Sequence, residues 1–236
     1  MIPQIFHQVW VGGEPLPEQF SRYRDTWREH HPHWELRLWT DDDLPPDLRR
    51  PEAYDRERIP AERSDIIRLD LLWRFGGVYM DTDMECRKPL EPLLEGVEFF
   101  AAPLKRGGQA NNAIFGSVPG HPLLDRALQE LRVQEIGTPF DKTYSGRLFF
   151  GALVAQFPGA TLLRHEDFHP STAAERKQAY AIHHRARSWK DADGWRDAAI
   201  QAEERLDKER RRHRKTKREL ERMKARLAEY EAATRD

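Results

Sequence analysis

Two aspartates, Asp81 and Asp83, stand one residue apart directly after the short apolar stretch "GGVYM". Side chains alternate along an extended chain, so a strand through this stretch would turn Tyr79, Asp81 and Asp83 to one side. Neighbouring carboxylates repel each other unless a cation lies between them, and carboxylate oxygens suit Mg²⁺ or Mn²⁺. The pair therefore predicts a divalent-metal site or, because the same letters arise by chance, a solvated acidic turn.

The segment before this stretch, residues 60–76, is predicted to be a helix. Pro60 lies in its first turn and Gly76 marks its end, which are the usual signals at the two ends of a helix. Asp65 and Arg68 are one turn apart and therefore share one face near the amino-terminal end. They are predicted either to contribute to the same site as the aspartates or to form an ordinary ion pair on the helix surface.

Short apolar runs alternate with helical patterns over the first 190 residues. This alternation predicts an α/β fold with a mostly parallel, doubly wound sheet, in which ligands bind at the carboxyl ends of the strands. The expected strands are residues 2–12, 34–40, 78–83, 97–104 and 111–118, and the expected helices are residues 15–32, 60–76 and 121–131.

Composition sets the broad class of the protein. The formal net charge of −1 does not favour a nucleic-acid partner, and Cys86, the only cysteine, excludes an internal disulfide and fits a reducing compartment. No window approaches the roughly 20 apolar residues that a membrane span needs, and no signal peptide is evident. The sequence predicts a cytoplasmic protein without a membrane span.

Residues 191–236 differ from the rest of the chain. They contain no proline, and residues 208–218 carry eight Lys or Arg against one Glu, which predicts a charged helical tail. Apolar residues recur there at spacings of three and four, as in a coiled coil: Leu220, Met223, Leu227 and Tyr230. Three roles stay open: a solvated helix, self-association of two copies, or docking of the basic block on a partner or on anionic lipid at the inner membrane face.

The stretch "ERSDIIRLDLLWRFGGVYMDTDM" resembles the sugar-binding region of the DXD glycosyltransferases, the group of the yeast Golgi α-1,6-mannosyltransferases and, more distantly, the clostridial glucosylating toxins. The shared pattern is Ser-Asp, two apolar residues, Arg, and Gly-Gly-x-Tyr-x-Asp-x-Asp. "IPQIFHQVWVGG" is similar to the opening strand of that family, and "AIHHRARSW" to its closing motif. The resemblance implies a GT-A type fold, Rossmann-like with a mostly parallel central sheet, as a catalytic domain over residues 1–190.

The resemblance also implies a metal site. Asp81 and Asp83 would hold Mn²⁺ or Mg²⁺, and His183 would complete the metal sphere, with His184 as the competing candidate. Mn²⁺ is favoured because it accepts imidazole more readily than Mg²⁺ does. Either histidine is alternatively a buried, hydrogen-bonded side chain.

The implied donor site is larger. Asp65, Arg68, Asp81 and Asp83 form its catalytic set, and Trp10 would stack on the nucleotide base unless it is a core tryptophan. The full set of donor-binding residues implied by the resemblance is Trp10, Asp65, Arg68, Tyr79, Asp81, Asn111, Asn112, Ser188 and Trp189.

The chain departs from the family at several positions. Arg147 stands after Gly146 where proline is expected, Arg185 replaces a tryptophan, and Arg187 replaces a glycine. These changes indicate either tighter donor binding or an altered acceptor.

The implied reaction is transfer of a hexose from a nucleoside diphosphate sugar to a hydroxyl of a glycan, lipid-linked or protein acceptor, with retention of configuration. Two other classes remain open. One is a non-catalytic module that binds a carbohydrate or a partner. The other is a phosphatase of the haloacid-dehalogenase type, whose Asp-x-Asp motif normally continues differently from "DTDMEC".

Overall fold

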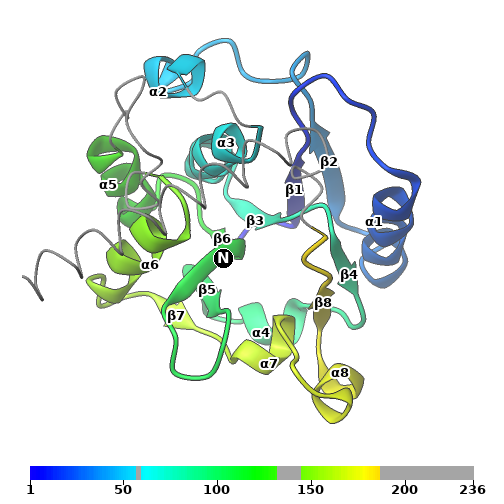
Figure 1. Cartoon of the computed structure of the whole chain (residues 1–236). Helices are drawn as coiled ribbons and strands as arrows, with labels where there is room; N and C mark the ends of the chain where they lie inside the picture. The colour runs from blue at the N-terminus through cyan, green and yellow to red at the C-terminus, as the bar shows by residue number, and fades with distance from the viewer. Residues whose placement is uncertain (57–59, 132–144, 187–236) are drawn as a thin grey trace, which may run out of the picture. The chain divides into compact units, whose positions relative to one another are not determined.

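The computed structural model describes residues 1–56, 60–131 and 145–186. A six-stranded sheet lies at the centre, in the order β2-β1-β3-β6-β5-β7 (Figure 1). Its strands are β1 (Ile5–Val9), β2 (Glu35–Trp39), β3 (Gly77–Met80), β5 (Phe99–Pro103), β6 (Ala110–Ser117) and β7 (Thr161–Leu162).

Five of these strands run in one direction. β1 pairs in parallel with β2 and β3, and β5 pairs in parallel with β7, whereas β6 is antiparallel to β3 and to β5. The prediction of an α/β fold with a mostly parallel sheet is confirmed. β6 is the exception because the short connection of residues 104–109 returns the chain directly beside β5, and parallel strands need a longer crossover.

Each face of the sheet carries its own apolar layer, because side chains alternate along the strands. Tyr79 packs into one layer, with α3 (Pro60–Phe75), α5 (Pro122–Glu130) and α6 (Arg147–Ala155) on that side. Val78 and Met80 pack into the other layer, towards α1 (Glu18–His30). The remaining short helices are α2 (Pro51–Arg56), α4 (Glu91–Leu94), α7 (His165–Phe168) and α8 (Ala173–Gln178).

The expected strand over residues 78–83 is wrong at its end. β3 stops at Met80, and a turn follows in which the Met84 amide donates to the Asp81 carbonyl at 3.2 Å. The chain then enters β4 (Met84–Cys86), which pairs antiparallel with β8 (Ala181–His183) in a separate two-stranded sheet. Asp83 therefore reaches the site through a turn and not through strand alternation.

A pair of glycines makes the tight join between α3 and β3. Gly76 and Gly77 have φ of +62° and +91°, in the left-handed region that favours glycine. A Cβ atom on Gly77 would lie 2.5 Å from the carbonyl oxygen of Ile5. The double glycine of the sequence pattern thus lets α3 end directly beside β1.

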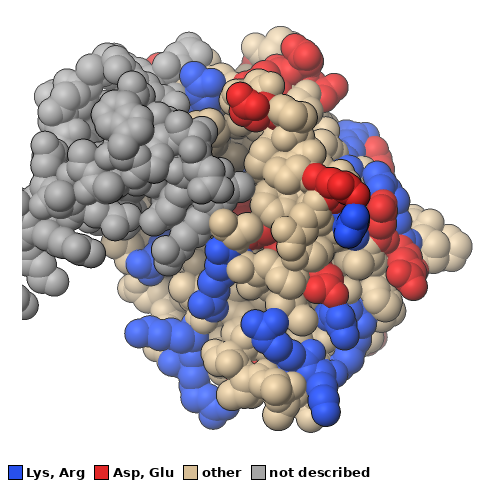
Figure 2. Space-filling view, turned by 45° about the vertical axis from the view of Figure 1, so that its right-hand side comes forward, with Lys and Arg blue, Asp and Glu red and all other residues tan. Residues whose placement is uncertain are grey.

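Both signs of charge occur on the face of the described chain that Figure 2 shows. Lys and Arg side chains predominate on its lower part, and Asp and Glu lie on its upper and right-hand parts together with further Lys and Arg. Across the described ranges, no helix is both long and apolar enough to cross a bilayer. The tail of residues 191–236, with its predicted coiled coil and the boundary near residue 190, lies outside the described residues and stays a prediction.

Candidate active site

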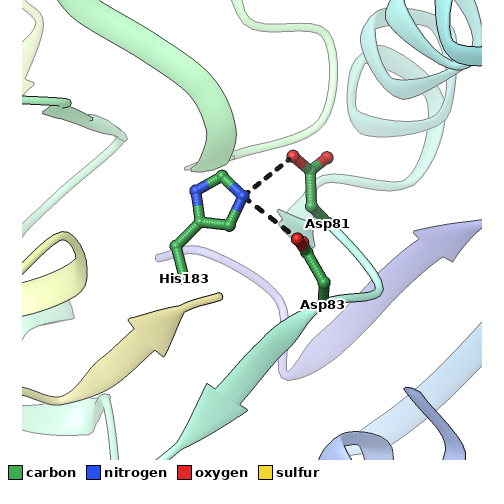
Figure 3. Close-up of side chains that lie close together, drawn as sticks. All are labelled: Asp81, Asp83 and His183. Atoms are coloured by element: carbon green, nitrogen blue, oxygen red, sulfur yellow. Dashed lines mark ion pairs between the residues drawn. The ribbon is translucent and has the colours of Figure 1, made fainter. Parts of the chain in front are cut away.

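Asp81, Asp83 and His183 converge at the carboxyl end of β3 (Figure 3). Nε2 of His183 lies 3.3 Å from a carboxylate oxygen of Asp83 and 3.8 Å from one of Asp81. One ligand atom from each of the three side chains lies within 4.8 Å of the others. Two carboxylates and one imidazole at this spacing form a set that suits a divalent cation such as Mn²⁺.

The small sheet brings His183 to the aspartates. In the β4–β8 pair His183 lies opposite Met84, the residue that follows Asp83. The chain after β8 also contacts Asp83: the Ala186 amide donates to its carboxylate at 2.7 Å, and the His184 amide donates to its carbonyl at 3.1 Å. The segment after β8 therefore closes around Asp83.

His184, the competing candidate, points elsewhere. Its Nε2 lies 2.9 Å from a carboxylate oxygen of Glu85, and its ring stacks on Tyr23 of α1 with centroids 4.3 Å apart. The structure therefore places His183, and not His184, with the two aspartates.

Arg68 ties α3 to the same edge of the sheet. It is 5% exposed, and its guanidinium donates to Asp81 at 3.1 Å and to the carbonyl of Asn112 at 2.7 Å. It also pairs with Asp65 at 3.1 Å and lies over the ring of Tyr79, 4.3 Å from the centroid. The interpretation as a surface ion pair is wrong, since one buried cation binds carboxylates from α3 and from the end of β3.

Tyr79 and Asn112 complete this network. The Tyr79 hydroxyl donates to Asp81 at 2.9 Å, so the two side chains share a side as the alternation predicted. The Asn112 side chain donates to Asp65 at 2.8 Å, whereas the Asn111 side chain accepts a hydrogen bond from the nearby amide of Ala113. Of the two candidate asparagines, Asn112 is the one in contact with a predicted site residue.

The two aspartates have opposite pKa shifts. Burial raises the pKa of Asp81, with Arg68 and His183 opposing it. Burial acts in the same sense on Asp83, but the hydrogen bond and charge of His183, together with the Ala186 amide, outweigh it and lower the pKa of Asp83. Asp83 is therefore the carboxylate that stays ionised most readily and is the stronger candidate for a direct metal ligand.

The remaining predicted residues divide into two groups. Trp10 directly follows β1, which is parallel to β3, so it lies at the same edge of the sheet as Asp81. Its half-buried ring packs edge-on against Phe20, and its indole N–H donates to the carbonyl of Glu14 at 2.7 Å. Ser188 and Trp189 lie outside the described residues.

Gly146 lies directly before the first residue of α6 and close to Asp65. A Cβ atom on Gly146 would lie 3.1 Å from a carboxylate oxygen of Asp65, so a larger residue would crowd this part of the site. Arg147, which stands where the family has proline, is exposed beside it.

Sequence reasoning missed one residue of the neighbourhood, His169. Its ring is 1% exposed and lies 5.2 Å from the ring of His183, centroid to centroid. Burial and the nearby His183 and Arg185 lower the pKa of His169 to about 3, so it is neutral near pH 7. Thirteen residues lie between the two histidines in the chain, and no motif in the sequence indicates that they meet.

Residues 17–100 match the family model described as a glycosyltransferase sugar-binding region containing a DXD motif. Mannosyl phosphorylinositol ceramide synthase SUR1 of Saccharomyces cerevisiae is 33% identical over 137 residues, which cover 56% of this chain and 35% of that protein. Inositol phosphoceramide mannosyltransferase 1 of Schizosaccharomyces pombe is 31% identical over 138 residues, which cover 55% of this chain and 43% of that protein.

Among solved structures, the PaToxG glycosyltransferase aligns with a TM-score of 0.56 at 16% identity, over 66% of this chain and 69% of that one. At this identity the likeness shows the fold alone, and that fold is of the GT-A type. The chain spans less than half the length of the two yeast relatives. The chain is thus similar to glycosyltransferases in its fold and, through residues 17–100, to the family of glycosyltransferase sugar-binding regions that contain a DXD motif.

Proposed function

We propose that the chain is a metal-dependent glycosyltransferase that moves a hexose from a nucleoside diphosphate sugar to an acceptor hydroxyl with retention of configuration. The observation that carries this proposal is the convergence of Asp81, Asp83 and His183 beside the buried Asp65–Arg68 pair. The site lies at the carboxyl end of a strand, where open α/β sheets bind ligands.

The residues present fit a divalent cation. Asp83 and His183 would hold it, with Asp81 beside them, and the Nδ1 atom of His183 has no hydrogen-bond partner among the described residues, so His183 is not committed to another structural contact through that atom. A bound cation would neutralise charge that grows on the departing diphosphate. The ionised state of Asp83 keeps a negative ligand available at neutral pH.

The contacts of Arg68 support a positioning role beside the donor-binding role that the resemblance implies. Its guanidinium already contacts Asp65, Asp81 and the Asn112 carbonyl, so it would hold these groups in place whether or not it also binds the donor. Asp65 would then accept hydrogen bonds from hydroxyls of the donor sugar, as charge-assisted acceptors do. Fixing both carboxylates before the donor binds avoids reorganisation during the reaction.

The state of the carboxylates favours one of the routes to retention. Arg68 engages Asp65 and Asp81, and His183 engages Asp83, so none of the three is presented as an unpaired nucleophile. A front-face route in which a phosphate oxygen of the donor takes the acceptor proton needs no such nucleophile. The two yeast relatives are named for mannosyl transfer to inositol phosphoceramide, so mannose is the first sugar, and a phosphoinositol lipid the first acceptor, to test.

The test is release of nucleoside diphosphate from a panel of UDP- and GDP-sugars by the purified chain. We expect turnover with Mn²⁺, none after EDTA, and a loss of about 100-fold or more in Asp83→Asn, because a preorganised charge contact in the site is removed. Asp25→Asn, which breaks an exposed pair with Arg28, is the matched control and should keep full activity.

Other outcomes favour the other classes. Turnover that survives EDTA and the Asp83→Asn change would refute the metal-dependent mechanism. Phosphate release from simple phosphate esters would indicate a phosphatase, and no turnover with any donor would indicate a binding module.

A further inference from the structure

Three buried ring nitrogens near the site lack hydrogen-bond partners within the described part of the chain. They are Nδ1 of His183 and both Nδ1 and Nε2 of His169. Buried polar atoms are nearly always paired, so each such atom calls for an explanation. That two adjacent imidazoles account for all three suggests one common cause.

His169 is held firmly in place beside His183. It follows α7, and its amide donates to the His165 carbonyl at 2.7 Å. The residue before it, Phe168, is fully buried and stacks on Phe100 of the central sheet, with centroids 6.3 Å apart. The His169 ring therefore lies 5.2 Å from the His183 ring at an interplanar angle of 54°, as a packed pair and not by a chance approach of a loose loop.

The ring nitrogen of His183 that carries the proton determines whether His183 can donate a hydrogen bond towards His169. Its Nε2 atom faces Asp81 and Asp83, so a metal at this site would take the lone pair of Nε2. A neutral imidazole that ligates through Nε2 carries its proton on Nδ1, and metal-bound histidines almost always donate that N–H to an outer partner. For His183 this Nδ1 atom is buried and has no acceptor among the described residues.

We propose that His169 is a positioning residue that accepts the Nδ1–H of His183, directly after a small ring rotation or through one buried water, and so fixes the tautomer that ligates the metal. The inference rests on the metal site of the proposed function and adds to it a residue outside the metal-ligand set. The second ring nitrogen of His169 remains a donor, which a buried water with two to four polar partners would satisfy.

A histidine that merely fills space beside His183 is the competing explanation. It can be separated from a positioning residue by two substitutions. His169→Phe keeps a flat ring of similar shape but removes both nitrogens, whereas His169→Gln keeps an acceptor and a donor. A filler would tolerate Phe better than Gln, and a hydrogen-bond partner would show the opposite order.

The experiment titrates Mn²⁺ alone into the full chain and follows the free ion by electron paramagnetic resonance. We expect His169→Phe to weaken Mn²⁺ binding by about 10- to 100-fold, the usual cost of losing an outer partner of a metal ligand. His169→Gln should bind close to the unsubstituted chain. His165→Gln is the matched control: it changes another buried histidine of the same segment, which pairs with Glu166 at 2.5 Å, and should leave Mn²⁺ affinity unchanged.

A second measurement covers the case in which His169→Phe fails to fold. In the unsubstituted chain labelled with ¹⁵N-histidine and loaded with diamagnetic Zn²⁺, one unprotonated ring nitrogen of His169 should show the ¹⁵N shift of a hydrogen-bond acceptor, with its signals assigned by their loss in His169→Gln. An unprotonated His169 nitrogen with the shift of a free lone pair, or a folded His169→Phe with undiminished Mn²⁺ affinity, would overturn the inference. If instead Asp83→Asn leaves Mn²⁺ binding intact, the metal site itself is wrong and the proposed function fails first.

Discussion

The buried guanidinium of Arg68 balances the negative charges of two carboxylates, which come from different elements. Burial opposes its charge, but Tyr79, Asp65 and Asp81 raise the pKa of Arg68 above its usual range, so it is always cationic. Removing it would take away the cation that contacts both Asp65 and Asp81. This is the arrangement in which breaking a buried pair is far more costly than replacing it entirely.

We therefore expect Arg68→Met to lower the free energy of unfolding by about 3–5 kcal/mol, measured by urea denaturation. Arg28→Met, which breaks the exposed pair with Asp25, should change stability by no more than about 0.5 kcal/mol. Equal effects of the two substitutions would show that the Arg68 network does not hold the site together.

His7 makes the stability depend on pH. Its Nδ1 accepts from the Trp39 indole at 3.1 Å and its Nε2 donates to the Gly76 carbonyl at 3.0 Å, which is a neutral tautomer. Burial lowers the pKa of His7 from 6.5 to about 4. Between these values the unfolded chain holds more protons than the folded chain, so stability falls as the pH falls.

From this shift, His7 alone should lower the free energy of unfolding by about 2 kcal/mol between pH 7 and pH 5. His7→Gln, which keeps a neutral donor and acceptor, should lose less stability over the same interval. Other buried histidines add to the loss in both proteins, so the informative quantity is the difference between their urea-unfolding free energies. An unchanged pH dependence in His7→Gln would contradict the assignment.

Sequence reasoning identified most of the site residues but not their contacts. Asp65, Arg68, Asp81, Asp83 and His183 all follow from residue types and resemblance, and the structure brings them together. That Arg68 is buried could not be predicted, because helix periodicity does not show that both faces of the sheet are covered. A lone histidine such as His169 carries no pattern of its own.

At the level of elements, α3 and the long strands were predictable and the small sheet was not. The ends of α3 follow from Pro60 and Gly76, whereas β4 and β8 are three residues each and pair across about a hundred residues of chain. Such short strands show no usable periodicity, and their pairing depends on tertiary contacts. His183, which β8 carries to the site, was therefore identified only by resemblance, and β8 itself was not predicted.

The double glycine gives a prediction at this scale. Gly77→Ala should destabilise the protein by about 3 kcal/mol or more, because a positive φ is combined with overlap between the new Cβ and Ile5. Gly120→Ala is the control: its φ is +66°, but nothing lies within 4 Å of the added Cβ, so the cost should be about 1 kcal/mol. Thermal unfolding of both variants separates the cost of the positive φ from the cost of the overlap with Ile5. Equal losses of stability in the two variants would rule out the overlap as the cause.

At the scale of the whole molecule, the described residues include most of the segment 17–100 that matches the family model, but they do not extend over the entire chain. The sheet places Trp10, Asp81 and the start of β6 at one edge, which α3 and the small sheet complete. The tail of residues 191–236 lies outside the described residues, so self-association and lipid docking stay predictions from its sequence. The mixed charges of the described surface do not by themselves select a partner.

The most direct test of the central claim is a crystal structure with Mn²⁺ and a nucleoside diphosphate, with the metal located by its anomalous scattering. We predict a single strong peak bound by Asp83 and His183, beside Asp81, and bridged to the diphosphate. A diphosphate bound without a peak at these side chains, or a peak elsewhere in the chain, would contradict the account.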